Sequence, residues 1–131
     1  MIAVLDASAA TELLIKGPNA TLIGDAVVRA EWVLVPGLYV AELTNVFWKY
    51  HQFAKLPYTE CEQAIATGLE LPDTFSDDRD LHREAFAMAC RCTHSVYDML
   101  YLVLARRHAA QLITMDKKLK QLANKHDVTT L

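Results

Sequence analysis

The sequence predicts an α/β fold, a three-layer α/β/α sandwich in which helices cover both faces of a mostly parallel sheet. Short apolar runs, such as those at residues 2–5 and 32–35, alternate with longer helical patterns, which is typical of βαβ units. The run at 2–5 has no polar residue, and strands of this kind are buried on both faces. With 131 residues, 53% of them hydrophobic, the chain is long enough for one core, and we predict one domain spanning 1–131.

Breakers and capping residues divide the first half of the chain. Gly17-Pro18 ends the first helix, and Asn19 is a favoured N-cap for the second. Pro36-Gly37 separates the second strand from a long helical pattern. We expect, in chain order, a strand at 2–5, helices at 7–16 and 19–30, a strand at 32–35 and a helix at 38–53.

The second half is divided in the same way. Thr59 is a possible cap for a helix after Leu56-Pro57, and Gly68 is expected beyond its end. Pro72 makes the segment 70–75 an edge strand or a loop. We expect helices at 59–67, at 76–91, from Thr93 or Ser95 to 108, and at 116–124, with strands at 112–114 and 128–131.

Composition excludes several classes of protein. The net charge of −3 does not indicate nucleic-acid binding. No apolar run approaches the roughly 20 residues needed to span a bilayer. The N-terminus lacks a basic region, so we expect a cytoplasmic protein without a membrane partner. Three cysteines give no disulfide framework, and Cys90 and Cys92 point to different sides of a helix, which argues against a zinc site.

Four acidic residues lie at the edges of apolar segments or inside one: Asp6, Glu42, Asp98 and Asp116. Asp6 and Asp116 follow predicted strands, and the carboxyl ends of parallel strands meet at one edge of a sheet. Asp98 interrupts the apolar run 96–104, where an unpartnered carboxylate is costly. A shared divalent cation would offset that cost, so the pattern predicts metal-dependent hydrolysis.

Each acid also has a simpler interpretation when it is taken alone. Asp6 and Asp116 are favoured N-caps for the helices that follow them. Glu42 is followed by Asn45, Lys49 and Gln52 at spacings of three, seven and ten, a polar stripe that suits a solvated helix face. Asp98 could form a buried pair with an arginine or a tyrosine hydroxyl. His94, four residues earlier, could approach the site, although a surface position is the favoured interpretation.

Two hydroxyls and several cations are further candidates. Ser8 lies two residues after the first acid and Thr114 two before the last, where they could orient a water or support a carboxylate, or serve turns and caps. The segment 106–125 is basic and could hold a polyanion, or simply form solvated faces. Its cations are Arg106, Arg107, Lys117, Lys118, Lys120 and Lys125.

Four segments together resemble the signature segments of PIN-domain nucleases. They read Val-Leu-Asp-Ala-Ser-Ala at 4–9, Ala-Glu-Leu-Thr-Asn-Val at 41–46, Tyr-Asp-Met-Leu-Tyr-Leu-Val-Leu-Ala at 97–105 and Leu-Ile-Thr-Met-Asp-Lys-Lys-Leu at 112–119. The chain looks most like the short VapC toxins of toxin–antitoxin pairs. The resemblance extends from residue 2 to about residue 130.

The resemblance implies a PIN-like parallel sheet with its acids at one end. It implies that Mg²⁺ or Mn²⁺ is bound by four ligands, which are Asp6, Glu42, Asp98 and Asp116. Ser8 and Thr114 match the hydroxyl positions beside the first and last acids, and Asn45 matches the polar residue one turn after the glutamate. A further acid found in some members is replaced here by Lys117-Lys118, which leaves one-metal chemistry open.

The implied activity is that of an endoribonuclease on single-stranded or looped RNA, leaving a 3′-hydroxyl and a 5′-phosphate. Arg106, Lys117 and Lys118 are candidates to hold the RNA backbone. The implied partners are an antitoxin and a second copy in a homodimer. Apolar residues that could form the antitoxin groove or a dimer contact, or could belong to the core, are Phe47, Trp48 and Trp32.

Two other functions remain open at this stage. One is a Mg²⁺-dependent phosphatase-like hydrolase, but such enzymes commonly use an Asp-x-Asp pattern and Asp6-Ala7-Ser8 lacks the second aspartate. The other is a non-catalytic PIN-like scaffold whose acids only cap helices. That scaffold predicts a neutral or stabilising effect when Asp98 is removed.

Overall fold

The computed structural model describes residues 1–131 and contains one parallel sheet of four strands in the order β3-β2-β1-β4. The central strand β1 pairs with β2 on one side and with β4 on the other. Its residues Ala3, Val4 and Leu5 are fully buried, as expected for a strand covered on both faces. The strands are β1 (Ile2–Leu5), β2 (Trp32–Pro36), β3 (Thr74–Ser76) and β4 (Gln111–Ile113).

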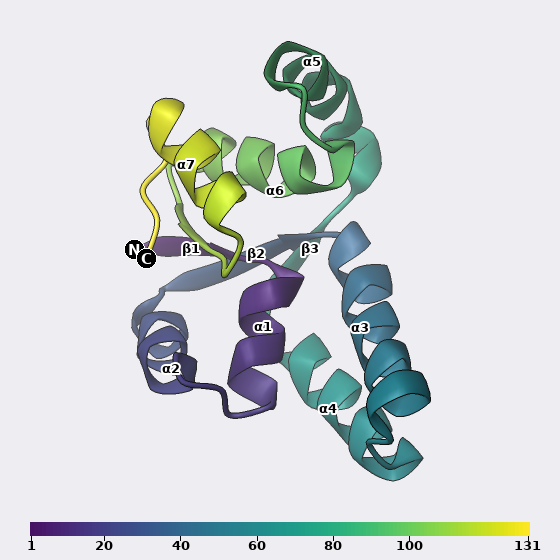
Figure 1. The fold of residues 1–131 in the computed structure, drawn as a ribbon. Coiled ribbons are helices and arrows are strands. Elements are labelled where there is room, and N and C mark those ends of the chain that lie inside the picture. The colour runs from purple at the N-terminus through teal and green to yellow at the C-terminus, as the bar shows by residue number, and fades with distance from the viewer.

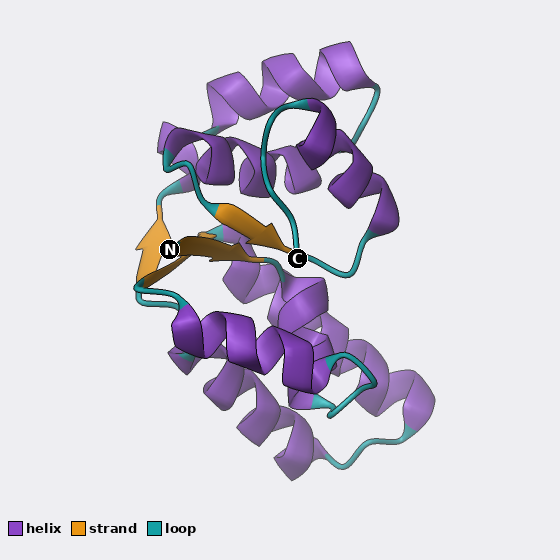
Figure 2. Ribbon diagram, turned by 90° about the vertical axis from the view of Figure 1, so that its left-hand side faces the viewer, coloured by secondary structure: helices purple, strands orange, loops and turns teal.

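Helices cover both faces of the sheet (Figure 1), and a second view shows the strands between the two helical layers (Figure 2). One layer holds α1 (Ala7–Leu14), α2 (Ala20–Arg29), α3 (Leu38–Ala54) and α4 (Tyr58–Glu70). The other holds α5 (His82–Cys92), α6 (Val96–Arg107) and α7 (Lys117–Lys125). The predicted three-layer sandwich is confirmed. None of the helices has the length and hydropathy that crossing a membrane requires.

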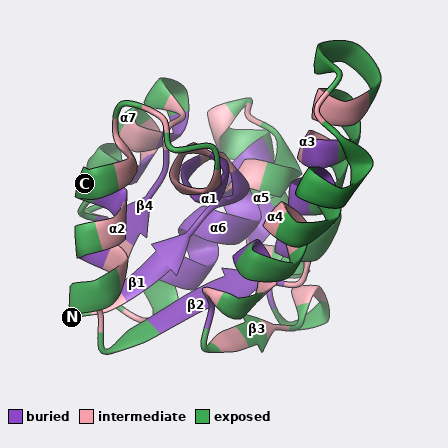
Figure 3. Cartoon of the chain, turned by 90° about the horizontal axis from the view of Figure 1, so that it is seen from below, coloured by how far each residue is buried: buried purple, intermediate pink, exposed green.

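The core is built around α6, which packs on the sheet and is buried from Met99 to Ala105 (Figure 3). Two tyrosines are among its largest fully buried side chains, and each hydroxyl has a partner. Tyr39 donates to the carbonyl oxygen of Gly68 at 2.7 Å, and Tyr101 donates to Glu42 Oε1 at 2.7 Å. Both bonds offset the cost of burying a hydroxyl.

The structure corrects the prediction for α4. Gly68 was expected beyond the end of this helix, but it lies inside, and the helix continues to Glu70. A Cβ atom at Gly68 would lie 2.5 Å from Leu43 Cδ2 on α3, so the glycine permits close packing of the two helices. The N-cap of α4 is Pro57 rather than Thr59.

Three other local predictions also change. Asn19 precedes α2, but its side chain makes no capping bond and instead donates to Glu12 Oε2 at 3.0 Å. Of the two alternative starts for α6, Ser95 is the N-cap, while Thr93 ends α5 with a left-handed φ of 50°. The expected strand at 128–131 is reduced to one isolated bridge between Leu112 and Thr130.

The expected helix at 76–91 is broken into two pieces. A short 3₁₀ helix, η1 (Asp78–Asp80), precedes α5, because Asp77 caps it by accepting from the backbone N–H of Arg79 at 2.9 Å. The uncertain segment at 70–75 leads into the edge strand β3, which pairs only with β2. This edge position agrees with the proline at 72, which cannot donate to a neighbouring strand.

Candidate active site

The four acids singled out in the sequence line one hollow of about 250 Å³. Asp6 follows β1, Glu42 lies in α3, Asp98 in the first turn of α6, and Asp116 follows β4. The parallel topology therefore gathers side chains that are up to 110 positions apart in the chain. The other lining residues are Ala7, Ser8, Asn45, Val46 and Lys49.

Asp6 is the most buried of the four acids, with 5% of its surface exposed. It is the N-cap of α1, because Oδ1 accepts from the backbone N–H of Ala9 at 2.9 Å. The same oxygen accepts from Ser8 Oγ at 2.6 Å, and Oδ2 accepts from the hydroxyl of Thr114. These bonds fix the orientation of the carboxylate at the edge of the hollow.

Ser8 and Thr114 also tie the end of β1 to the loop after β4. Ser8 Oγ accepts from the backbone N–H of Met115 at 2.9 Å, and Thr114 Oγ1 accepts from that of Asp116 at 3.0 Å. The two hydroxyl oxygens lie 3.3 Å apart. Each hydroxyl therefore supports a carboxylate and also stabilises the turn, so both roles considered for it in the sequence are present.

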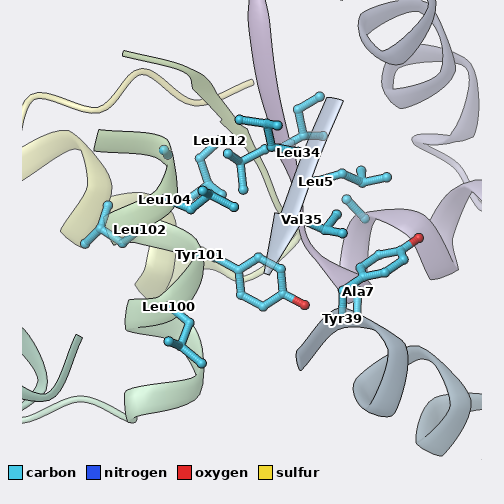
Figure 4. Packing of buried hydrophobic residues seen from close by; sticks show 14 of the residues in the cluster. Leu5, Ala7, Leu34, Val35, Tyr39, Leu100, Tyr101, Leu102, Leu104 and Leu112 are labelled. Carbon is cyan, nitrogen blue, oxygen red and sulfur yellow. The ribbon is translucent and has the colours of Figure 1, made fainter. Parts of the chain in front are cut away.

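Glu42 is held by Tyr101, a residue that the sequence analysis did not single out. The Tyr101 ring extends from α6 into the interior (Figure 4), and its hydroxyl donates to Glu42 Oε1. Glu42 Oε2 has no hydrogen bond. One signal was present in the sequence, because Tyr101 lies three residues after Asp98 and therefore on the same side of the helix.

Asp98 lies less deep than its apolar surroundings predict, because it occupies the first turn of α6 and its side chain is 26% exposed. Its partner is His94, whose Nε2 lies 2.7 Å from Asp98 Oδ2, and not an arginine or a tyrosine. The favoured interpretation of His94 as a surface residue is also wrong, since only 16% of its side chain is exposed.

Asp116 is the N-cap of α7, where its Oδ1 accepts from the backbone N–H groups of Lys118 at 2.9 Å and Leu119 at 3.2 Å. Its Oδ2 makes no hydrogen bond within the chain. Glu42, Asp98 and Asp116 therefore each keep one carboxylate oxygen free. None of these oxygens is a buried unpaired atom, so all three remain open to a ligand.

The hollow is strongly negative, and its charges disfavour one another. Burial raises the pKa of Asp6 from an ordinary value of 3.8 to about 6, against the hydrogen bonds that lower it, and the charge of Asp98 adds to the rise. The pKa of Glu42 is also raised, by burial first and then by the charges of Asp6 and Asp98, while the Tyr101 bond opposes the rise. Bringing a cation into the hollow would relieve both effects.

The donor set fits a hard divalent cation, because all four acids present carboxylate oxygens and no sulfur or imidazole lines the hollow. No group of three or more His, Cys, Asp or Glu side chains is gathered closely enough to hold an ion as it stands. Ligation would therefore require side chains to rotate toward one another, with the three free oxygens as the first available ligands.

The remaining candidates fall into two groups. Asn45 lines the hollow, whereas Arg106 lies near the other end of α6 and pairs with Glu84 at 2.6 Å. Lys117 and Lys118 are exposed on the first turn of α7, outside the lining. The cation that does line the hollow is Lys49, which makes no ion pair and which the sequence placed only on a polar stripe.

Comparison with known proteins gives matches over nearly the whole chain. The family described as PIN domain matches residues 3–125. The curated relative Ribonuclease VapC3 from Pyrobaculum aerophilum is 27% identical over 123 residues, which are 90% of this chain and 92% of that protein.

Two solved structures share the fold. The crystal structure of PAE2754 from Pyrobaculum aerophilum has a TM-score of 0.76 at 20% identity and covers 99% of this chain and 83% of that one. VapBC2 from Rickettsia felis, solved with a DNA fragment from its promoter, has a TM-score of 0.65 at 14% identity and covers 100% of this chain and 98% of that one.

Proposed function

The chain belongs to the PIN-domain family, and from that premise we propose that it is a metal-dependent endoribonuclease and the toxin of a toxin–antitoxin pair. The observation that carries the proposal is the convergence of four carboxylates, from four separate elements, on one hollow. Helix capping alone would require only Asp6 and Asp116, and it leaves Glu42 and Asp98 without a reason to face them.

We propose that these four carboxylates hold one Mg²⁺ or Mn²⁺ ion. When bound, such a cation lowers the pKa of a water molecule and neutralises charge on the scissile phosphate. The chain itself orients two of the four acids, because Ser8 and Thr114 bond to Asp6 and the Tyr101 hydroxyl bonds to Glu42. A carboxylate of the set accepts the proton that the attacking water releases.

The substrate side of the hollow is formed by α3. Asn45 and Lys49 follow Glu42 at spacings of three and seven, so they extend one face of the helix along the hollow. We propose that the Lys49 ammonium binds a phosphate oxygen of the RNA and that the Asn45 amide donates to another. Attack on the phosphorus would leave a 3′-hydroxyl and a 5′-phosphate.

RNA is favoured over a small phosphate ester as the substrate. The curated relative that this chain matches over 92% of that protein's length is named as a ribonuclease. In addition, Ser8 Oγ is occupied by Asp6 and by the backbone of Met115, so the Asp6-Ala7-Ser8 segment has no free second acid or hydroxyl for phosphatase chemistry. Lys117 and Lys118, exposed beside Asp116, add two positive charges outside the hollow that favour a longer polyanion.

Removal of the metal tests this function directly. We expect the chain to cleave a pool of structured and unstructured RNA in Mg²⁺ or Mn²⁺ and to stop when the metal is chelated, because the carboxylates alone repel the phosphate. Cleavage is followed on sequencing gels, and product ends are identified by their susceptibility to phosphatase and ligase. A calorimetric titration with Mn²⁺ measures binding in parallel.

Three results would contradict parts of the proposal. RNA cleavage that persists in chelator would exclude the metal. A folded chain that neither binds Mn²⁺ nor cleaves RNA would favour the scaffold. Metal-dependent hydrolysis of a small phosphate ester, with RNA left intact, would favour the phosphatase-like enzyme.

Tyr101→Phe should weaken metal binding and cleavage by about 10- to 100-fold, because Glu42 loses the hydroxyl that orients it. Tyr39→Phe is the matched control, since it deletes an equally buried hydroxyl that donates to Gly68 rather than to a carboxylate. It should lower the free energy of unfolding by about 1 kcal/mol and leave metal affinity unchanged. Equal metal affinity in the two variants would exclude a positioning role for Tyr101.

We also propose an antitoxin as partner, docking on an apolar groove between α3 and α4. The groove measures about 290 Å³. Trp48 is half exposed and Tyr58 is 65% exposed at its rim, while Phe47 is buried and forms the floor. Its lining residues are Thr44, Phe47, Trp48, His51, Tyr58, Cys61, Glu62 and Ile65. The similar fold of VapBC2 supports a two-protein assembly.

The predicted apolar trio does not form one surface. Trp32 lies away from the groove, where its Nε1 donates to Thr74 Oγ1 at 2.8 Å and its ring meets His108 edge to face at 5.4 Å. We propose that a homodimer forms through an exposed apolar surface outside the groove, so that the groove stays free for the antitoxin.

A further inference from the structure

Tyr97 is an exposed aromatic residue directly before Asp98. It is 61% exposed, whereas α6 is buried from Met99 to Ala105. Its ring pairs with no other aromatic ring, and its hydroxyl makes no hydrogen bond. The core therefore gives no reason for an aromatic side chain at this position.

The Tyr97 ring lines a second hollow that adjoins the carboxylate hollow. This second hollow measures about 280 Å³ and is lined by Leu38, Ala41, Glu42, Asn45 and Tyr97. Glu42 and Asn45 line both hollows, so the two are continuous across one face of α3. If one phosphate of a polynucleotide entered the first hollow, the neighbouring nucleotide would lie in the second hollow.

The two hollows differ in chemistry. No cation lines the second hollow, and Glu42 would repel a phosphate there. Leu38, Ala41 and the Tyr97 ring offer an apolar floor and an aromatic face instead. A neutral, planar group suits this lining, and in RNA that group is a base.

We propose that Tyr97 is the stacking platform for one unpaired base of the RNA, adjacent to the phosphate that is cleaved. This inference rests on the proposed ribonuclease function and adds a contact outside the metal ligands. Stacking requires an unstacked base, so Tyr97 selects single-stranded or looped RNA over a duplex. Because every base has an aromatic face, the platform strengthens binding at one position without dictating a strict sequence.

Substitution of Tyr97 measures the contribution of the platform. Tyr97→Ala should lower kcat/KM for a short single-stranded RNA by about 5- to 100-fold, and Tyr97→Trp should retain or raise it. Phe86→Ala on α5 is the matched control, because Phe86 is 63% exposed but lines neither hollow. Mn²⁺ affinity, measured by calorimetry, should be the same in all four proteins.

Abasic RNA then locates the base. In a series of substrates that each lack one base, the wild type should lose the same 5- to 100-fold at a single position next to the cut. Tyr97→Ala should be insensitive at that position, which a merely structural role of Tyr97 would not produce.

Two outcomes overturn the inference separately from the function. If the wild type cleaves RNA and Tyr97→Ala cleaves with the same kcat/KM, the platform is excluded while the ribonuclease stands. The same holds if Tyr97→Ala keeps the full sensitivity of the wild type to each missing base. If the wild type cleaves no RNA in any metal, the proposed function fails and this inference fails with it.

Discussion

Replacing Asp98 with asparagine should reduce metal-dependent RNA cleavage by about 100-fold or more, because a ligated cation supplies several kcal/mol of charge stabilisation in the transition state. Asparagine keeps the shape of the side chain and an oxygen that His94 can bond, so α6 should form as before. The variant loses one of the negative charges that we propose to hold the cation. Initial rates of cleavage in Mg²⁺ and Mn²⁺ measure the effect.

The matched control for this substitution is Asp25→Asn. Asp25 is exposed on α2 and lines no part of the carboxylate hollow, so the same change of charge should leave cleavage unaffected. If Asp98→Asn cleaves as fast as the wild type, the four-carboxylate site is wrong. Equal losses in both variants would show that net charge, and not the site, governs the rate.

The stability of the metal-free protein should fall as the pH rises from about 4 to about 7, owing to Asp6. The pKa of this group is raised from 3.8 to about 6, so the folded chain holds the proton more tightly than the unfolded chain. The stabilisation is complete below the unfolded pKa and is lost as the pH rises through the folded one. The shift corresponds to about 3 kcal/mol at this buried side chain.

Comparison with Asp6→Asn isolates this contribution from the other titrating groups. Asparagine can still accept from Ser8 and Ala9, and it can donate to Thr114. We expect the variant to show a smaller loss between pH 4 and 7, because the contribution of Glu42, whose pKa is also raised, remains. It should be more stable than the wild type at pH 7, by up to about 3 kcal/mol. Urea unfolding at a series of pH values in chelator measures both proteins.

Added Mg²⁺ should make the wild type more stable than Asp6→Asn at pH 7. The cation stabilises the wild type by mass action and does little for Asp6→Asn, whose ligand set is incomplete. Parallel pH curves for the two metal-free proteins would show that Asp6 is not the source of the change.

Strands β1, β2 and β4, and the acids that follow β1 and β4, could be predicted from the sequence because the signals are local. Residues 2–5 are apolar without interruption, which indicates a buried strand, and Asp6 directly after them has the preferences of an N-cap. Parallel pairing then places the ends of β1 and β4 at one edge. The gathering of Asp6 and Asp116 thus follows from strand order, even though the two residues are far apart in sequence.

The partners of the acids could not be predicted, because they depend on how helices overhang the sheet. The run at 96–104 reads as buried throughout, yet its first turn projects past the core, so Asp98 is partly exposed and within reach of His94. Tyr101 reads as a core residue, and only the crossing of α6 and α3 brings its hydroxyl to Glu42.

The roles of Gly68 and Lys49 were also missed in the sequence, for a different reason. In the linear sequence Gly68 resembles a residue that ends a helix. In the folded structure it lets α4 pack closely against Leu43. Lys49 belongs to a stripe that looks solvated, and its position beside four carboxylates is a property of the assembled hollow. In both cases the decisive neighbour lies on another element, where local propensity carries no information.

The bonds from Ser8 and Thr114 to Asp6 have a consequence for the order of events during synthesis on the ribosome. Thr114, whose hydroxyl donates to Asp6 Oδ2, is synthesised 108 residues after Asp6, and Asp116 is synthesised two residues later. Until β4 has left the exit tunnel and paired with β1, the nascent chain holds an incomplete set of acids. A site built in this way cannot assemble before the last of its four acids has emerged from the ribosome.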